Sequence, residues 1–217
     1  MPRGRTHFVF DLDGTILSST SFYHAILETI FSRNGLILTQ EDKKLAMGLS
    51  ARSFLAPKLK AEALDEALCH LRDQSKFDIE HIPLFEGIDE ILHMLHRRGD
   101  RLAIWTSRDK ASALSLLEKR GIIHFFEVVV SADCIIKHKP DPEGLFLIAN
   151  VFGCVLADMV MIGDHDVDIL AAKATGALPI RANWHGYMPG AECNFGALTI
   201  HSVQDLAKIL NRDPGHV

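Results

Sequence analysis

The sequence predicts an α/β fold in which helices cover both faces of a parallel β-sheet. Short apolar runs recur along the chain, and segments with helical periodicity lie between them. The runs are apolar at successive positions, which is typical of strands that are buried on both faces. Glycines follow the helical segments where helix C-caps are expected, at Gly99, Gly121, Gly153 and Gly176. The predicted architecture is therefore Rossmann-like.

The strands and helices of this predicted core alternate in a regular order. The first strand is His7–Phe10, which is rich in aromatic and branched residues and ends at the turn signal Asp13-Gly14. Later strands are expected at Arg101–Ser107, Phe126–Asp133, Asp158–Asp164 and Ala177–Ala182, with a weaker one at Ala197–Ser202. The helices are expected at Gly87–Arg98, Lys110–Arg120, Pro142–Phe152, Val167–Thr175 and Val203–Leu210.

One long segment interrupts the alternation. From about Ile16 to Ile82 the apolar residues recur at i, i+3, i+4 and i+7, and no strand is apparent. We interpret this segment as a helical insert that leaves the core after the first strand. The predicted domains are a core of residues 1–16 and 83–217 and a cap of residues 17–82.

Composition narrows the class of protein. The chain has 217 residues, 47% hydrophobic residues and a net charge of −5 without a basic stripe, so it favours a small-molecule ligand over nucleic acid. No apolar run approaches the ~20 residues that span a bilayer, and no signal-peptide core precedes the first aspartates. We expect a cytoplasmic monomer or homodimer. The four cysteines are widely spaced, which predicts reduced, core-filling thiols: Cys69, Cys134, Cys154 and Cys193.

Polar residues follow the predicted strands at their carboxyl ends, where open α/β sheets bind ligands. Asp11 and Asp13 follow the first strand. The others are Thr106 and Ser107 after the second strand, Lys139 in the segment after the third, and Asp164 and Asp168 after the fourth. An Asp-Gly pair alone is more often a simple turn, but four strand ends of this kind favour a site.

Grouped carboxylates repel one another, and a hard cation such as Mg²⁺ holds them ionised together. A calcium loop is excluded, because neither acidic stretch has the required glycine at position six or glutamate at position twelve. With a phosphorylated ligand, Asp11 is placed to attack phosphorus and Asp13 to act as acid and base. Thr106 would hydrogen-bond a phosphoryl oxygen and Lys139 would balance its charge. Backbone N–H groups around Leu12–Thr15 could help to bind the phosphate.

The motifs D-x-D-G-T and G-D-x-x-x-D, with a threonine after the second strand and a K-P-D-P-E segment between, resemble those of the haloacid dehalogenase-like hydrolase superfamily. The resemblance extends from His7 to about Ser202 and is strongest to the phosphoglycolate phosphatase-like and phosphomutase-like groups, which carry a helical cap. It implies that Asp11 is the nucleophile, Asp13 the acid/base, and Thr106 and Lys139 the phosphate-binding residues. It further implies that Mg²⁺ is bound by the Asp11 carboxylate, the Asp13 carbonyl and Asp164, with Asp168 in support.

Substrate-binding candidates are Gly14, Thr15, Ser107 and, in the cap, Arg52. Other residues have simpler interpretations: Lys137 as a solvated charge, and Asp166 as a helix N-cap. Asp168 alone would also suit the first turn of a helix. The chain departs from the family pattern at Ser18, Glu86, Ser107 and His165, which leaves the substrate open.

The leading hypothesis is a Mg²⁺-dependent phosphatase that acts on a small phosphorylated metabolite through an aspartyl-phosphate. A phosphomutase would share every core residue, although the histidine expected after the first loop is matched only approximately by Tyr23 and His24. A dehalogenase is disfavoured by the presence of Asp13. A binding module without activity is disfavoured because clustered charges are costly without a ligand.

Overall fold

The computed structural model describes residues 6–78, 81–184 and 195–211. The chain forms two compact units. One, the sheet unit, contains residues up to Ser18 and from Leu84 onward, and the other, the helical unit, contains Ser19–Pro83. Within the described ranges no helix has the length and apolar character needed to cross a membrane.

The sheet unit is built on a six-stranded sheet with the order β3-β2-β1-β4-β5-β6. All five neighbouring pairs are parallel. The strands are β1 (His7–Phe10), β2 (Arg101–Trp105), β3 (Val128–Val130), β4 (Met159–Gly163), β5 (Leu178–Ala182) and β6 (Leu198–Ile200). The strand order reverses between β1 and β4, which is where open α/β sheets bind ligands.

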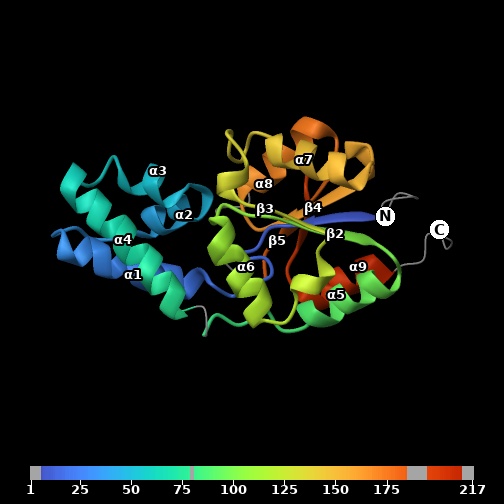
Figure 1. Ribbon diagram of the computed structural model, residues 1–217, viewed down its shortest axis with the longest axis horizontal. Helices are drawn as coiled ribbons and strands as arrows, with labels where there is room; N and C mark the ends of the chain where they lie inside the picture. The colour runs from blue at the N-terminus through green and yellow to red at the C-terminus, as the bar shows by residue number, and fades with distance from the viewer. Residues whose placement is uncertain (1–5, 79–80, 185–194, 212–217) are drawn as a thin grey trace. The chain divides into compact units, whose positions relative to one another are not determined.

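Helices lie on both faces of this sheet. They are α5 (Ile88–Arg97), α6 (Lys110–Lys119), α7 (Glu143–Phe152), α8 (Asp166–Thr175) and α9 (Val203–Asn211). Figure 1 shows α7 and α8 above the strands and α5 and α9 together below them. The predicted Rossmann-like α/β fold is therefore confirmed.

The apolar runs of the strands bury both of their faces. Val9 and Trp105 pack with Leu145 and Ile148 of α7 in one cluster. Phe8 and Phe10, which alternate with Val9, are equally buried on the opposite side. Burial on both faces explains why the strands carry no polar alternation.

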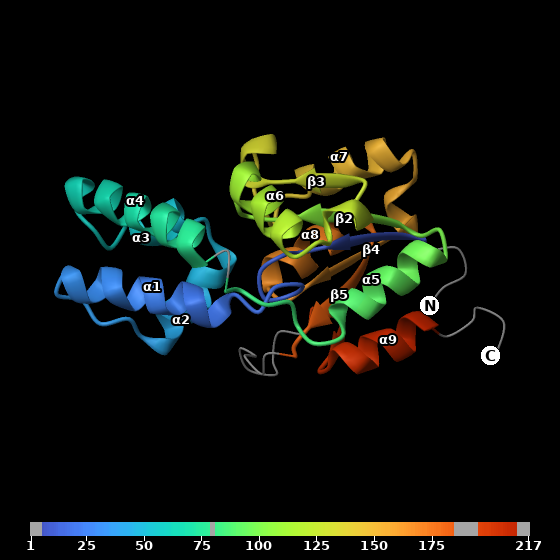
Figure 2. The ribbon, with the colours of Figure 1, turned by 60° about the horizontal axis from the view of Figure 1, so that its bottom comes forward.

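The helical unit contains α1 (Thr20–Arg33), α2 (Gln40–Gly48), α3 (Ala51–Leu55) and α4 (Ala61–Asp78). Within this unit α1 and α4 contact each other, and α3 contacts α4 (Figure 2). Their apolar stripes form a separate core around Leu27, Phe31, Phe54 and Leu71. The stacked rings of Phe31 and Phe54, 6.0 Å apart, join α1 to α3.

Three expectations need correction. The third strand is shorter than predicted, because the chain turns into a 3-10 helix at Ala132–Cys134. Cys69 and Cys134 are exposed rather than core-filling, and Cys154 is half-buried; Cys193 lies outside the described residues. The N-cap of α8 is His165, not Asp166. The Asp168 carboxylate accepts a hydrogen bond from the His165 N–H, as in a capping box.

Candidate active site

Strand pairing brings the acidic residues together. β1 and β4 are parallel neighbours with Phe10 opposite Ile162, and the Asp11 N–H donates to the Ile162 carbonyl at 2.8 Å. Asp11 and Asp164 follow these paired strands and so emerge at the same edge of the sheet. Asp168 lies in the first turn of α8, which starts beside that edge.

The two motif glycines allow these carboxylates to approach the backbone. Gly14 has φ +80°, and a Cβ at this position would lie 2.3 Å from Oδ2 of Asp164. A Cβ at Gly163 would lie 2.4 Å from Cγ of Asp168. Any larger residue at these two positions would displace an acidic side chain, which gives a physical reason for both glycines.

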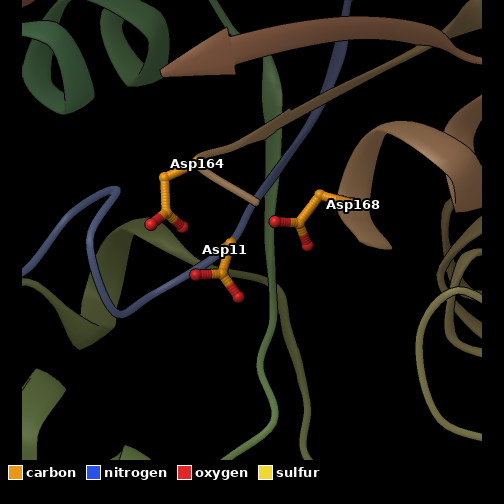
Figure 3. Close-up of side chains that lie close together, drawn as sticks. All are labelled: Asp11, Asp164 and Asp168. Atoms are coloured by element: carbon orange, nitrogen blue, oxygen red, sulfur yellow. The ribbon is translucent and has the colours of Figure 1, made fainter. Parts of the chain in front are cut away.

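The carboxylates of Asp11, Asp164 and Asp168 form one cluster. Each offers an oxygen within 4.8 Å of the others. Figure 3 shows the three side chains converging from the end of β1 and from the β4–α8 segment. Asp11 and Asp168 are buried and Asp164 is partly buried.

Lys139 completes the cluster from the segment between β3 and α7. Its Nζ lies 2.6 Å from Oδ1 of Asp11 and 2.7 Å from Oδ1 of Asp168. It also donates to the Trp105 carbonyl at 2.7 Å and lies 4.9 Å from the centre of the Trp105 ring. The Lys139 side chain is only 3% exposed, so its direction is fixed by these partners.

Burial and the neighbouring charges shift the pKa values of this cluster in opposing directions. Desolvation raises the pKa of the Asp11 carboxyl well above its ordinary value; Lys139 opposes the shift, whereas Asp168 and Asp164 add to it. Burial would lower the pKa of the Lys139 ammonium, but the carboxylates of Asp11 and Asp168 outweigh burial and raise it. Lys139 therefore offsets only part of the effect of burial on the Asp11 pKa, and a bound cation would offset more of it.

Thr106 and Ser107 follow β2 at the same edge. Thr106 is buried, and its Oγ1 accepts from the Arg108 N–H at 3.1 Å, which leaves its hydroxyl hydrogen available to donate. Ser107 is exposed. Both lie where the sequence predicts.

Asp13 forms an ion pair with Arg108 that the sequence analysis missed. Arg108 Nε donates to Oδ2 of Asp13 at 2.5 Å, and Nη2 donates to Oδ1 at 2.7 Å. An arginine two residues beyond Thr106 was the available signal, but nothing in the sequence indicates which carboxylate it meets.

Arg181 is a second arginine of the site that the sequence analysis missed. This buried residue on β5 donates to the Asp164 carbonyl at 3.3 Å and to Oδ1 of Asp166 at 2.5 Å. Arg181 therefore ties both the loop before α8 and the first residue of that helix to β5.

The remaining candidates occupy varied positions. The Thr15 hydroxyl is buried and donates to Oδ1 of Asp164 at 3.5 Å. The Gly14 N–H donates to the Leu17 carbonyl at 2.9 Å, so in this structure it is engaged within its own turn. Arg52 belongs to the helical unit, where it pairs with Asp65 at 3.3 Å.

Comparisons with known proteins identify the family of the chain. The family model for haloacid dehalogenase-like hydrolases matches residues 8–181. The chain therefore belongs to the haloacid dehalogenase-like hydrolase family.

Individual relatives carry phosphatase names. The chain is 36% identical over 129 residues to a plasmid phosphoglycolate phosphatase of Cupriavidus necator, which covers 58% of this chain and 55% of that relative. It is 28% identical over 174 residues to the pyrophosphatase PpaX of Halalkalibacterium halodurans, which covers 77% of this chain and 79% of that relative. A solved hydrolase structure from Pseudomonas syringae superposes with a TM-score of 0.82 at 24% identity, covering 94% of this chain and 97% of that one, and so shares the fold.

Proposed function

We propose that the protein is a Mg²⁺-dependent phosphatase that hydrolyses a small phosphorylated metabolite through an aspartyl-phosphate on Asp11. The observation that carries the proposal is the buried contact of Asp11 with Lys139, beside Asp164 and Asp168. Burial raises the pKa of the Asp11 carboxyl, so burying this group in its charged form lowers the stability of the fold. Strongly shifted pKa values of this kind are concentrated at catalytic sites, which supports a catalytic role for Asp11. The phosphatase names of the relatives support the same reaction class.

The donor set fits Mg²⁺. The ion would be held by the carboxylates of Asp11 and Asp164 and by the backbone carbonyl of Asp13. Asp168 would support the site indirectly, because its carboxylate pairs with Lys139 and accepts from the His165 N–H at the start of α8. These are oxygen ligands, which Mg²⁺ prefers. When bound, the ion would neutralise charge on the phosphoryl oxygens and favour the ionised form of Asp11.

The residues of the site then have defined tasks. An Asp11 oxygen forms a bond to phosphorus as the bond to the leaving oxygen breaks, and Asp13 donates a proton to that oxygen. In the second step Asp13 takes a proton from water, the water oxygen attacks phosphorus, and the Asp11–phosphorus bond breaks to release phosphate.

Phosphate binding is the task of the residues around Asp11. Thr106 donates its hydroxyl to a phosphoryl oxygen, and Lys139 compensates the charge of the transferring group. Gly14, Thr15 and Ser107 are the candidate substrate contacts within the sheet unit, with Arg52 the candidate in the helical unit.

Trapping the intermediate tests this assignment. With an aryl phosphate and Mg²⁺, Asp13→Asn should form the phosphoryl adduct on Asp11 and accumulate it, because the good leaving group needs little protonation. Its turnover should fall by roughly 10² to 10⁴-fold, the usual contribution of acid–base catalysis. Asp11→Asn should form no adduct, because an amide does not attack phosphorus.

Mass spectrometry after an acid quench reads both outcomes. An adduct on Asp11→Asn, or on a serine or histidine, contradicts the role of Asp11. Full turnover in excess chelator contradicts the role of Mg²⁺. Release of inorganic phosphate from a sugar phosphate, without an isomeric product, separates hydrolysis from phosphomutase activity.

A further inference from the structure

Arg108 contacts the acid/base candidate in a geometry that involves both carboxylate oxygens. Its Nε and Nη2 bind Oδ2 and Oδ1 of Asp13 at 2.5 and 2.7 Å. The remaining nitrogen, Nη1, donates to Ser112 Oγ at 3.2 Å. The whole guanidinium therefore lies at the carboxyl edge of the sheet, between Asp13 and the start of α6.

The backbone of Arg108 fixes this position. Its N–H donates to Thr106 Oγ1 at 3.1 Å, and its carbonyl accepts from the Ala132 N–H at 2.8 Å. The Arg108 backbone is thus hydrogen-bonded both to Thr106, the predicted phosphate-binding threonine, and to the segment that follows β3. Its side chain is 17% exposed and that of Asp13 is 24% exposed, so the pair is accessible from solution.

A pair of this kind places a fixed positive charge beside the proposed acid/base residue. To protonate a leaving oxygen, a carboxyl oxygen of Asp13 has to come within about 2.6–3.2 Å of it. Both Asp13 oxygens accept from the guanidinium, but each carboxylate oxygen has two lone pairs, so the pair with Arg108 can remain while one oxygen serves the leaving oxygen. A leaving group that reaches Asp13 therefore also comes close to the Arg108 guanidinium.

We propose that Arg108 is a specificity-determining residue that binds a second anionic group on the leaving-group side of the substrate. A carboxylate or second phosphate there is attracted by the guanidinium charge and accepts a charge-assisted hydrogen bond from it. A neutral leaving group lacks this charge–charge attraction. The inference rests on the proposed function, since it requires that Asp13 serves the leaving oxygen.

A matched pair of substrates tests the proposal: phosphoglycolate and 2-hydroxyethyl phosphate, which has a CH₂OH group in place of the carboxylate. The wild-type enzyme should favour phosphoglycolate in kcat/KM by about ten- to a hundredfold, the size expected for a hydrogen bond to a charged group. Arg108→Gln should reduce this ratio to near one, whereas Arg108→Lys should retain part of it. In Arg108→Gln we expect kcat/KM to fall chiefly for phosphoglycolate, so the ratio of the two kcat/KM values changes.

Two further variants serve as controls. Ser112→Ala removes the Nη1 contact but not the pair with Asp13, and the ratio should persist. Arg52→Gln removes the other arginine that is a candidate for binding substrate; it can change the rates with both substrates, but the ratio between them should persist.

The outcomes separate this inference from the proposed function. An equal fall for both substrates in Arg108→Gln would show that Arg108 only holds Asp13 in place, and would overturn the inference. A wild-type ratio near one, or a ratio that is lost in Arg52→Gln but not in Arg108→Gln, also overturns it while the phosphatase activity stands. Turnover of aryl phosphate by Asp11→Asn, or its absence in the wild type, overturns both.

Discussion

The two units of the molecule use charged residues in opposite ways. Among the described residues, the buried charged side chains all belong to the sheet unit: Asp11, Asp100, Lys139, Asp168 and Arg181. The helical unit keeps its charges at or near the surface. There Asp42 accepts from Thr39 and pairs with Lys58 at 2.5 Å.

Asp11 and Asp42 show the consequence for a single residue type. Burial raises the pKa of Asp11, whereas hydrogen bonds from Lys58 and Thr39 lower the pKa of Asp42 to about 2. The environment of Asp11 opposes its charge and so favours a ligand that compensates it. The environment of Asp42 already stabilises the charge, which is what a helix cap requires.

The largest expected effect comes from removing Lys139, a buried cation of the sheet unit. Lys139→Ala leaves Asp11 and Asp168 buried without their ammonium partner, and breaking such a buried pair costs about 3–5 kcal/mol in the free energy of unfolding. Urea unfolding of the full chain measures this cost. Lys137→Ala is the matched control, because its pair with Asp141 is long, 3.8 Å, and exposed. Similar losses in both variants would contradict the distinction between buried and exposed charge.

Two glycines with positive φ, one in each unit, give the next effect. Gly14→Ala combines backbone strain with a Cβ 2.3 Å from Asp164, whereas Gly35 has φ +67° and nothing within 4 Å of its Cβ. Gly35→Ala should lose only the strain, about 1–2 kcal/mol. Gly14→Ala should lose more stability and also displace Asp164, so phosphatase activity should fall. If Gly14→Ala and Gly35→Ala lose equal stability and Gly14→Ala keeps its activity, the position of Asp164 does not depend on Gly14.

The capping box of α2 should give a smaller, pH-dependent effect in the helical unit. Thr39→Ala removes the side chain that accepts from the Asp42 N–H, at a cost of about 1 kcal/mol in the free energy of unfolding.

The contribution of Asp42 to stability depends on pH. Because the folded pKa of Asp42 is lowered to about 2, its contribution to the free energy of unfolding is present above the ordinary pKa near 3.8 and is lost as pH falls towards 2. Hydrogen exchange of α2 peptides at pH 5 and pH 2.5 measures this loss. Asp42→Asn should remove the pH dependence of that segment, and an unchanged dependence would assign it to other groups.

The sequence predicted the sheet unit closely because its signals are local. The strand that precedes Asp11 and the one that precedes Asp164 are continuous apolar runs, and parallel pairing then brings their ends together. The motif spacing located Lys139 and Asp168 as well, although their direct contact is visible only in the structure.

Other features of the site depend on contacts that the sequence does not encode locally. The pair between Asp13 and Arg108 joins residues 95 positions apart, and Arg181 reaches the Asp164 loop across a strand pair. The N-cap of α8 at His165 was missed because Asp166 is the more common N-cap type, while the local geometry brings Asp168 back to the His165 N–H.

The smallest expected effect tests whether the helical unit takes part in the chemistry. Arg52 and Asp65 lie 3.3 Å apart with 65% and 75% of their side chains exposed. A double-mutant cycle on this pair should give a coupling of about 0–0.5 kcal/mol, weaker at high salt, because water screens such pairs. If Arg52 also binds substrate, Arg52→Gln should raise KM for phosphoglycolate although it hardly changes stability, and Asp65→Asn should leave KM unaltered. If KM is unchanged in both variants, Arg52 does not bind the substrate. If KM rises in both, the ion pair between Arg52 and Asp65 positions the substrate.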